Sequence, residues 1–482
     1  MATATAAPKS DLRYYIHSVI AIAIMVFARF IPVSYPFTQD GMLVLGVLIG
    51  AIYAYVNGNP YWGSIVALLI IGMSEVTTVG AIFVSLMSNG NLMFLTVLFV
   101  FVGYLGSVGF ARTLALKIVQ SKMTKGRPWV LTLFLFIAAV TPASFMSVSA
   151  VFVLTLPILY AICDEVGMER DSKWAVMTAI GIGCACGFAL VFWPFQVGPV
   201  AMYGQLAALG YGGGAYVFLQ HVLFMLIIVG LCIGAMVMVI KFLKPDISKL
   251  YNYSPPEEKA KFNEEQRFAV GLVCLLLALF IVPQFLPRGS AIQVFMAQFG
   301  MFAIVSFVLT VGVFVRKNGK PRLDMVEATR GLQMWPLIIM IGSVLVIADI
   351  LTRPELGFID FVTLHLGPIL GVNSPVVFTI IVMIIALIIT TFVQGTLVVA
   401  IMLPLMLPIA TAMGFSIMAV IMPFLFIANI GLIFPSSHPL GAIMHGHESI
   451  GPKATIKYVG LYMAVFAVIV LVVGIPLGLL IF

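Results

Sequence analysis

Charged residues are scarce in this chain. Asp, Glu, Lys and Arg together make up 9% of its 482 residues, hydrophobic residues make up 62%, and the mean hydropathy is +1.16. A soluble domain carries roughly a quarter charged residues and does not need so much apolar surface. The strand-like alternation of a β-barrel is also lacking. The composition therefore excludes an ordinary soluble protein and predicts an all-α polytopic membrane protein.

Cysteines are few, and the common catalytic motifs are missing. The five cysteines fall in apolar segments, and Cys184 and Cys186 do not form a CxxC pair, so we expect neither a disulfide nor a metal site. The apolar segments contain no HExxH motif and no paired Asp, which disfavours an intramembrane enzyme. The glycine-rich residues 210–214 are not followed by GK[ST], so they indicate a loop and not a phosphate cradle. The net charge of +7 comes from short loops between apolar runs, so no nucleic-acid partner is expected.

The chain does contain a polar interruption inside an apolar region. The apolar run at residues 129–140 is too short to cross a bilayer, which takes roughly 20 residues. It is followed by Ser144, Ser147 and Ser149 and then by a second apolar arm that ends near Gly167. Non-helical backbone at membrane depth persists only where it is buried in protein or faces a water-filled cavity. The pattern predicts a helical hairpin that enters the membrane and turns back, with its hydroxyl-bearing tip at a site.

The same device occurs a second time. Residues 391–415 align without a gap with the first hairpin at an offset of 247 residues, so that Leu403-Pro404 matches Leu156-Pro157. The polar tip 394–396 then lies over the polar tip 147–149. Paired, short, interrupted hydrophobic segments in two halves of a chain are the best sequence pointer to a transporter's binding site. We therefore interpret them as the two tips of an inverted repeat and not as two ordinary proline-kinked helices.

The apolar runs predict about eleven transmembrane helices plus two re-entrant hairpins that enter from opposite faces. Two crossings are broken, near residues 192–196 and 435–439, and the basic segment 112–127 is expected to be a cytoplasmic loop. The first apolar run is expected to be an uncleaved span of a protein of the cell (inner or plasma) membrane, with the N-terminus cytoplasmic and the C-terminus external. The predicted order is first-repeat scaffold spans (1–127), first hairpin with its broken helix and following span (128–243), cytoplasmic linker (244–266), second-repeat scaffold (267–373), and second hairpin, broken helix and last span (374–482).

The two tips and the two breaks converge in this topology. A helix that starts at such a break offers free N–H groups and the positive end of its dipole, which bind an anion without a buried Lys or Arg. No Lys or Arg lies in the apolar parts of these elements. The predicted substrate-binding residues are Ser147, Ser149, Gln394, Thr396, Gln196, Pro194, Ser437, His438 and Pro439.

Other polar residues in the apolar regions are expected to be structural. Thr155 on the hairpin arm should bond back to a backbone carbonyl. For His438, a structural hydrogen bond and a contact with substrate or proton are equal alternatives. His445 and His447 are expected to be solvated loop residues, and His17, His221 and His365 to be interfacial.

The order of elements and the tip motifs resemble the divalent anion/sodium symporter family of the ion transporter superfamily. Those proteins carry Ser-Asn-Thr at each hairpin tip, a Leu-Pro helix after it and a Thr-Pro-Pro-Asn-like break in the next crossing. Here Leu156-Pro157 and Leu403-Pro404 match, whereas the asparagine is lost from both tips. The positions of the motifs are occupied by Ser147-Val148-Ser149, Gln394-Gly395-Thr396, Trp193-Pro194-Phe195-Gln196 and His438-Pro439-Leu440-Gly441. The resemblance implies a homodimer, elevator-like movement of the hairpin domain, and a carboxylate or similar anion held by Ser149 and Thr396.

The resemblance also implies a sodium ion beside each tip, held partly by the tip asparagine. With Val148 and Gly395 at those positions, the remaining oxygen ligands are Ser144, Ser147, Thr391 and Gln394. We therefore expect at most one sodium site and no other cofactor. Proton coupling, with His438 as the titratable group, or anion exchange is the favoured alternative.

These observations predict a secondary active transporter of small organic anions, most simply a mono- or dicarboxylate. An inorganic oxyanion carrier, a cation/proton antiporter and a channel stay open as alternatives. An antiporter should carry a titrating carboxylate within the membrane. Its candidates here are Asp349, near the end of a span, and Glu75, which is expected to be interfacial.

Overall fold

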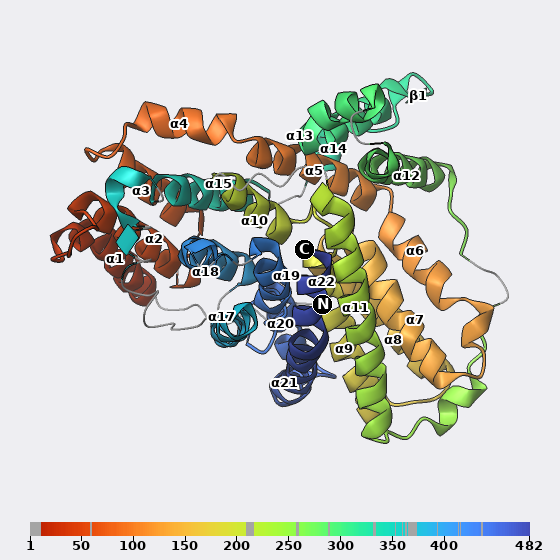
Figure 1. The fold of residues 1–482 in the computed structure, drawn as a ribbon. Coiled ribbons are helices and arrows are strands. Elements are labelled where there is room, and N and C mark those ends of the chain that lie inside the picture. The colour runs from red at the N-terminus through yellow and green to blue at the C-terminus, as the bar shows by residue number, and fades with distance from the viewer. Residues whose placement is uncertain are drawn as a thin grey trace.

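The structure is a computed structural model. It describes residues 11–482 except 58–59, 209–215, 257–259, 288–289, 331–333, 352, 359, 362–363, 365–373, 393, 413, 415 and 435–436. The described chain is almost entirely helical, with one short strand pair, as the sequence predicts (Figure 1). His365, which the sequence predicts to be interfacial, lies outside the described residues.

The N-terminal helices and α15 form one side of the molecule (Figure 1). Glycines let α1 and α2 approach closely, because a Cβ at Gly50 would lie 2.8 Å from the Ala21 carbonyl oxygen. A separate short helix, α4, precedes α5. The elements are α1 (Asp11–Phe27), η1 (Ala28–Phe30), α2 (Gln39–Asn57), α3 (Pro60–Gly72), α4 (Val79–Ser88), α5 (Gly90–Ser107) and α15 (Met334–Leu351).

The basic segment after α5 is mainly helical, so the expectation of a loop was wrong there. Helix α6 (Phe110–Val119) buries Ala111, Ala115 and Val119 at a spacing of four residues, and it packs on α7 and α8. Arg112 and Lys117 lie on its exposed face. The basic residues lie on the solvated face of the helix, and the apolar stripe on the opposite face was not recognised in the sequence. A 3-10 turn, η2 (Lys122–Thr124), completes the segment.

The two hairpins are matching helix pairs. The first consists of α7 (Pro128–Ala143) and α8 (Val148–Glu165), and the second of α17 (Pro375–Thr390) and α18 (Gly395–Ala412). All four helix ends of the second pair lie 247 positions after those of the first, the offset found in the sequence. Each pair begins with proline at the first helical turn and ends at a glycine with positive φ, Gly167 and Gly414. Each half therefore contains the same start and stop signals.

Both expected breaks are present, but the second is longer than predicted. Helix α9 (Lys173–Phe192) is separated from α10 (Val197–Ala208) by residues 193–196. Helix α19 (Ile417–Ala428) already ends at Asn429, well before the predicted start at Pro435, and α20 (Pro439–Gly446) resumes after residues 429–438. The physical reason is a close backbone approach: a Cβ at Gly431 would lie 2.0 Å from the Thr390 carbonyl oxygen. Pro435 and Ser436 lie outside the described residues.

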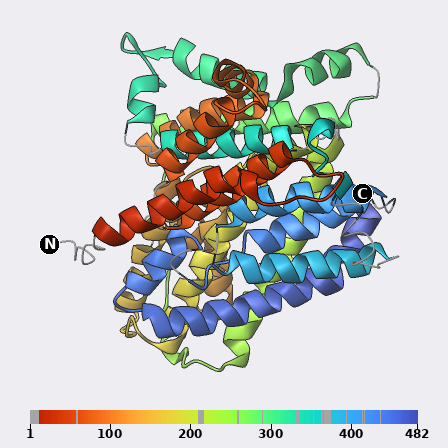
Figure 2. The ribbon, with the colours of Figure 1, turned by 90° about the vertical axis from the view of Figure 1, so that its left-hand side faces the viewer.

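Each break helix packs on the hairpin of the other half. Helix α10 contacts α18, and α20 contacts α8, so the two repeats interlock around the molecular centre. Figure 2 shows many of the long helices running side by side in the perpendicular view. The tips and breaks of both halves are thereby brought to one place.

The remaining elements connect and flank the two halves. Residues 316–321 form a β-hairpin tied to the start of α12, where Lys317 Nζ lies 2.7 Å from Glu264 Oε2. The carboxylates of Glu264 and Glu265 raise the pKa of Lys317 above its ordinary value. The elements are α11 (Tyr216–Phe242), η3 (Ser248–Asn252), α12 (Glu264–Phe285), α13 (Ala291–Phe314), β1 (Arg316–Lys317), β2 (Lys320–Pro321), α14 (Met325–Thr329), η4 (Pro354–Leu356), α21 (Gly451–Ile469), η5 (Val470–Gly474) and α22 (Ile475–Ile481).

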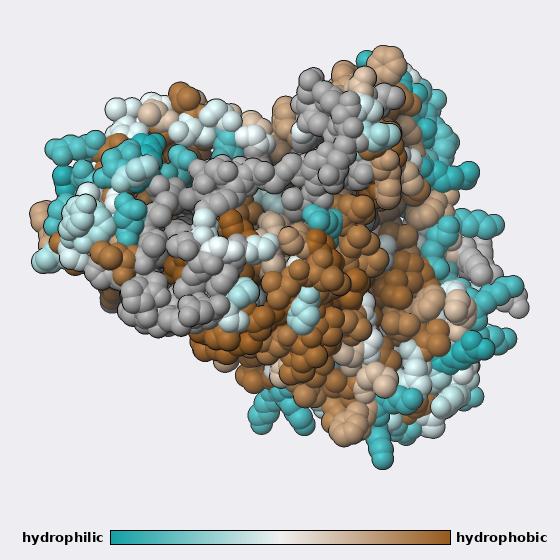
Figure 3. Space-filling view, viewed as in Figure 1, coloured by the Kyte–Doolittle hydropathy of each residue, from teal (hydrophilic) through white to brown (hydrophobic). Residues whose placement is uncertain are grey.

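The helices are suited to a membrane. Five of those described are long and apolar enough to cross a bilayer, and a bent pair made by α4 and α5 brings the number to six. A further eight apolar helices have 10–17 residues. Figure 3 shows a continuous hydrophobic surface at the lower centre of one face, bordered below and to the right by hydrophilic residues. The protein is an all-α polytopic membrane protein, while the number of eleven crossings stays a prediction.

Candidate functional site

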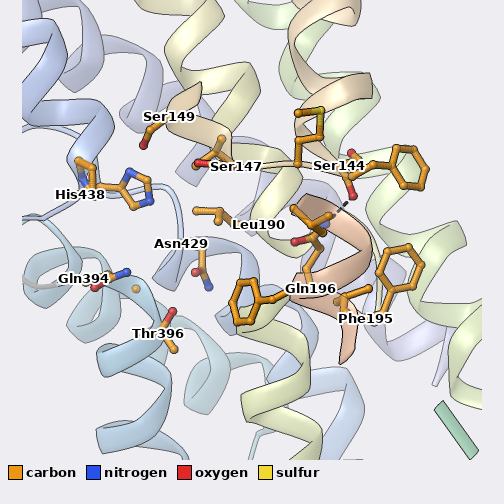
Figure 4. Close-up of a pocket in the computed structure, with 18 of the residues that line it drawn as sticks. Ser144, Ser147, Ser149, Leu190, Phe195, Gln196, Gln394, Thr396, Asn429 and His438 are labelled. Carbon is orange, nitrogen blue, oxygen red and sulfur yellow. Dashed lines mark hydrogen bonds between the residues drawn. The ribbon is translucent and has the colours of Figure 1, made fainter. Parts of the chain in front are cut away.

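A cavity of about 310 Å³ lies where the two hairpin tips and the two breaks meet (Figure 4). The scaffold helices α5 and α12 close its remaining side. Eight of the nine predicted substrate-binding residues line it: Ser147, Ser149, Gln196, Gln394, Thr396, Ser437, His438 and Pro439. Segments from both halves of the chain thus contribute to one enclosed space.

Pro194 does not line the cavity. It lies in the turn in which the Gln196 N–H donates to the Trp193 carbonyl at 3.0 Å, and the turn buries it. Proline fixes φ for the first central position of such a turn. Its neighbours Phe195 and Gln196 face the cavity instead. Pro194 shapes the break and is not among the lining residues, so its role as a substrate-binding residue stays a prediction.

The first tip presents unused hydrogen-bonding groups. Ser147 is the N-cap residue of α8, but its hydroxyl makes no capping bond, so the first amides of the helix are uncapped. Ser147 is exposed to the cavity and Ser149 is half-buried. Neither hydroxyl bonds to a described residue. The tip can therefore donate two hydroxyls and backbone N–H groups to a ligand.

The second tip is equivalent in position. The side chain of Thr396 is only 9% exposed, yet its hydroxyl bonds to no described residue and faces the cavity. Gln394 is half-buried beside it and likewise has no side-chain bond to a described residue. The hydroxyl is therefore open to a ligand or to water in the cavity.

Neighbouring hydroxyls form structural hydrogen bonds within their own helices. Thr155 Oγ1 donates to the Val151 carbonyl at 2.7 Å, which confirms its expected role. Ser144 and Thr391, the two cation candidates at matching positions, do the same, with distances of 2.8 Å to Val140 O and 2.7 Å to Leu387 O. Their hydroxyl protons are committed, although the oxygen lone pairs are not. Ser144 lines the cavity and Thr391 does not.

Gln196 joins the first break to the first tip. Its Nε2 donates to the Ser144 carbonyl oxygen at 2.5 Å, the bond drawn in Figure 4. Because its side chain is used in this way, it does not cap α10. The start of that helix adds a further set of N–H groups near the cavity.

His438 is both a helix cap and a wall of the cavity. Its Nδ1 accepts the Leu440 N–H at 3.1 Å, which makes it the N-cap of α20. The proton of the neutral ring is therefore on Nε2, which is available as a donor. The side chain is 8% exposed and lines the cavity. The neighbouring Ser437 hydroxyl donates to the Phe434 carbonyl at 2.7 Å, so it is structural.

Asn429 is a lining residue that the sequence analysis missed. Its Nδ2 donates to the Leu425 carbonyl at 2.9 Å, at the end of α19. A Cβ at Gly395 would lie 2.7 Å from its Oδ1, so its carboxamide reaches the position where a longer second-tip side chain would start. The available signal was an isolated amide in an apolar run, followed two positions later by Gly431.

The histidines outside the cavity divide into several environments. His221 was expected at the interface but is fully buried, with Nε2 2.8 Å from the Val191 carbonyl and Nδ1 3.0 Å from the Tyr203 hydroxyl. It satisfies a free carbonyl in the last turn of α9, beside the first break. His17 contacts Tyr53 at 2.7 Å. His447 stacks on Tyr160 and is half-buried, so it is not a freely solvated residue.

His445 and the two acidic candidates lie away from the cavity lining. His445 Nδ1 is 2.8 Å from the Gly441 carbonyl, which makes it a helical residue. Glu75 is paired at the surface with Arg29. Asp349 belongs to α15. No Asp, Glu, Lys or Arg is among the described residues that line the cavity.

The electrostatic character of the cavity comes from helix ends. Helices α8, α10, α18 and α20 all begin at it, and a helix N-terminus carries about half a positive charge. Ser147, Ser149, Gln394, Thr396 and the His438 Nε2–H add uncharged donors. Such an arrangement can bind an anionic group.

Comparisons with known proteins agree with this architecture. The family model described as citrate transporter (CitMHS) matches residues 60–353. No curated protein sequence matches the chain. The crystal structure of the YdaH transporter from Alcanivorax borkumensis aligns with a TM-score of 0.58 at 13% identity, over 98% of both chains. MtrF from Neisseria gonorrhoeae, described as illuminating a class of antimetabolite efflux pumps, aligns with a TM-score of 0.57 at 12% identity, over 95% of this chain and 96% of that one.

Similarity at this level of identity shows a shared fold. The family match is stronger, because it covers more than half of the sequence, from α3 through α15. Together with the polytopic helical architecture, it shows that the chain belongs to the citrate transporter family.

Proposed function

We propose that the protein is a secondary active transporter of small organic anions, in the form of mono- or dicarboxylates. The observation that carries the proposal is the convergence of four helix N-termini and four unbonded tip side chains on one cavity, with no charged side chain among its described lining residues. A carboxylate bound there would accept hydrogen bonds from Ser149, Thr396 and the helix amides. Citrate, the substrate in the family's name, is also a small organic anion, with three carboxylates.

The transport mechanism in the proposal is alternating access of the elevator type. The cavity lies between the hairpin and break elements on one side and α5 and α12 on the other. Movement of the first group against the second would expose the anion to either face of the membrane. The same proposal includes a homodimer and a plasma-membrane location with a cytoplasmic N-terminus. It also includes the predicted domain limits and the closer likeness to the divalent anion/sodium symporters.

The site is tested by removing single hydroxyls. Thr396→Val keeps the side-chain shape, and Ser149→Val adds one carbon atom. Each deletes a donor to a charged ligand, which costs about 1.5–3 kcal/mol, or roughly tenfold to more than a hundredfold in Kd. Binding and uptake should fall to background while folding is unchanged. Thr155→Val is the matched control, since its hydroxyl is bonded within α8 away from the cavity. Wild-type transport by both tip variants would exclude the hairpin tips as the site.

Membrane topology is tested by labelling. A cysteine placed at Lys261 should react only from the cytoplasm and one at Glu355 only from outside. Labelling of both from one face would contradict the opposite orientation of the two repeats, and with it the alternating-access proposal.

For coupling, we propose at most one sodium site, with proton coupling or anion exchange favoured over strict sodium dependence. Val148 and Gly395 give no side-chain oxygen at the tips, and a small hard cation requires a full oxygen shell. Uptake into proteoliposomes should persist when choline replaces sodium and should change with a pH gradient or internal substrate. A steep and absolute sodium requirement would contradict this coupling scheme.

A further inference from the structure

The cavity has two unlike sides. The polar groups of both tips and the second break gather on one side in Figure 4, where Ser147, Ser149, Gln394, Thr396 and Asn429 are labelled. The other side is built from scaffold side chains without hydrogen-bonding groups. These are Leu98, Phe99, Phe101 and Val102 of α5 and Leu276 of α12. A ligand that fills the cavity must meet both surfaces.

We propose that the preferred substrate is an amphipathic monocarboxylate. Its single carboxylate lies at the tips, and its apolar body, aliphatic or aromatic, lies against α5 and α12. The inference rests on the proposed function and narrows its substrate class. It departs from the polar tricarboxylate in the family's name.

The apolar side is available to a ligand. Phe101 and Leu276 are 1% exposed and form the packed base of this wall. Phe99 and Val102 are half-buried and keep side-chain surface open on the cavity side. Phe195, from the first break, stacks on Phe280 of α12 at a ring-centroid distance of 5.5 Å and extends the wall. Removing such surface from water with an apolar group favours binding.

The polar side matches one carboxylate better than several. A carboxylate offers about four acceptor positions, which the tip hydroxyls, the Gln394 amide and the amides at the starts of α8 and α18 can fill. A second or third carboxylate on the same ligand would face Phe99, Val102 and Leu276. No Lys or Arg among the described lining residues would compensate its charge. Burying a charge without a partner is strongly unfavourable.

The experiment is a binding series on the full-length protein purified in detergent, measured by calorimetry. Acetate, butyrate and hexanoate share one headgroup and differ in apolar length, while succinate and citrate add carboxylates. Affinity should rise about fourfold per buried methylene along the monocarboxylates. Hexanoate should therefore bind more tightly than succinate or citrate. An affinity that does not change with chain length would overturn the inference. Tighter binding of citrate or succinate than of hexanoate would also overturn it.

A variant in the wall locates the effect. Val102→Thr keeps the shape of the side chain and places a hydroxyl in the apolar surface, so it should weaken hexanoate severalfold and leave acetate unchanged. Val97→Thr on the same helix is the matched control, because Val97 packs in the scaffold core and does not line the cavity. Equal weakening of acetate and hexanoate by Val102→Thr would show that the wall does not hold the chain, and would overturn the inference.

The two proposals fail in different ways. If citrate or succinate binds best and Thr396→Val abolishes that binding, the transporter site stands and the amphipathic substrate is wrong. If none of the carboxylates binds and Thr396→Val leaves uptake unchanged, the proposed function falls together with the inference.

Discussion

The two hairpins have the same length to the residue, but they are attached to their breaks in different ways. At the first, a side chain reaches across: Gln196 Nε2 donates to the Ser144 carbonyl at 2.5 Å. At the second, the Thr390 hydroxyl donates to the Ala428 carbonyl and the backbones also touch, since Gly395 and Gly431 leave room only for the main chain of residues 428–429 and of Thr390. The comparison shows that the repeat conserves helix boundaries while the contacts that close the site are built separately in each half.

The largest effect is expected where backbone meets backbone. In Gly395→Ala, the new Cβ would lie 2.4 Å from the Ala428 carbonyl oxygen, which no side-chain rotation relieves. Overpacking of a core typically costs 1–3 kcal/mol and occasionally more, and a rigid backbone contact should fall at about 3 kcal/mol. The variant should melt at a lower temperature and lose transport.

The control for this change is a glycine in open space. Gly271→Ala on α12 meets no atom within 4 Å and replaces a poor helix former by a good one, so it should be neutral or slightly stabilising. If Gly395→Ala melts like Gly271→Ala, the second hairpin is not held by close backbone contact, and the contrast with the first half disappears.

This contrast also shows where prediction from the sequence succeeded. The hairpins could be placed because their signals are local: proline at the first helical turn, Leu-Pro inside the second arm and a closing glycine, all repeated at one offset. The end of α19 could not be placed from the sequence. Asn429 ends that helix where it packs against Gly395, and Gly431 makes room for Thr390 of another helix. Such contacts between segments distant in sequence leave no periodic pattern.

The site shows the same division. Polar residues at the tips were recognisable because they interrupt apolar runs, whereas Asn429 and the apolar wall on α5 look like ordinary parts of membrane helices. His221 also appeared interfacial from its place near the start of a span. Its burial depends on Tyr203 and on the end of α9, which only the tertiary structure brings together.

An intermediate effect is expected from cutting one side-chain hydrogen bond between hairpin and break in each half. Thr390→Val removes the bond from Oγ1 to the Ala428 carbonyl, 2.5 Å long and fully buried, without changing the side-chain shape. Leaving a buried acceptor unpaired should cost about 1–3 kcal/mol. Gln196→Ala removes the bond at the first half, but the Ser144 carbonyl lies beside the cavity where water can replace the lost donor, so its cost should be about 1 kcal/mol.

The two variants should also differ in whether they change mainly substrate affinity or mainly thermal stability. Gln196 lines the cavity and Thr390 does not, so Gln196→Ala should change substrate affinity more than thermal stability. Thr390→Val should do the reverse. Melting temperature and Kd measured on both proteins test this. Equal losses of stability and affinity in the two variants would contradict the conclusion that the two hairpins are attached to their breaks in different ways.

The smallest effect is expected at the one pair of side chains that both tips share. Ser144 and Thr391 lie at matching positions and donate to the carbonyl four residues earlier, at 2.8 and 2.7 Å. Such back-bonds stabilise a helix little, since the acceptor already takes part in the backbone ladder. Ser144→Ala and Thr391→Val should therefore lower stability by less than about 1 kcal/mol and leave substrate affinity near its original value. The informative measurement is uptake as a function of sodium concentration in each variant. If sodium were bound by these oxygens, one variant or both would need more sodium for the same rate. An unchanged response in Ser144→Ala with a shifted one in Thr391→Val would place the single proposed site at the second tip.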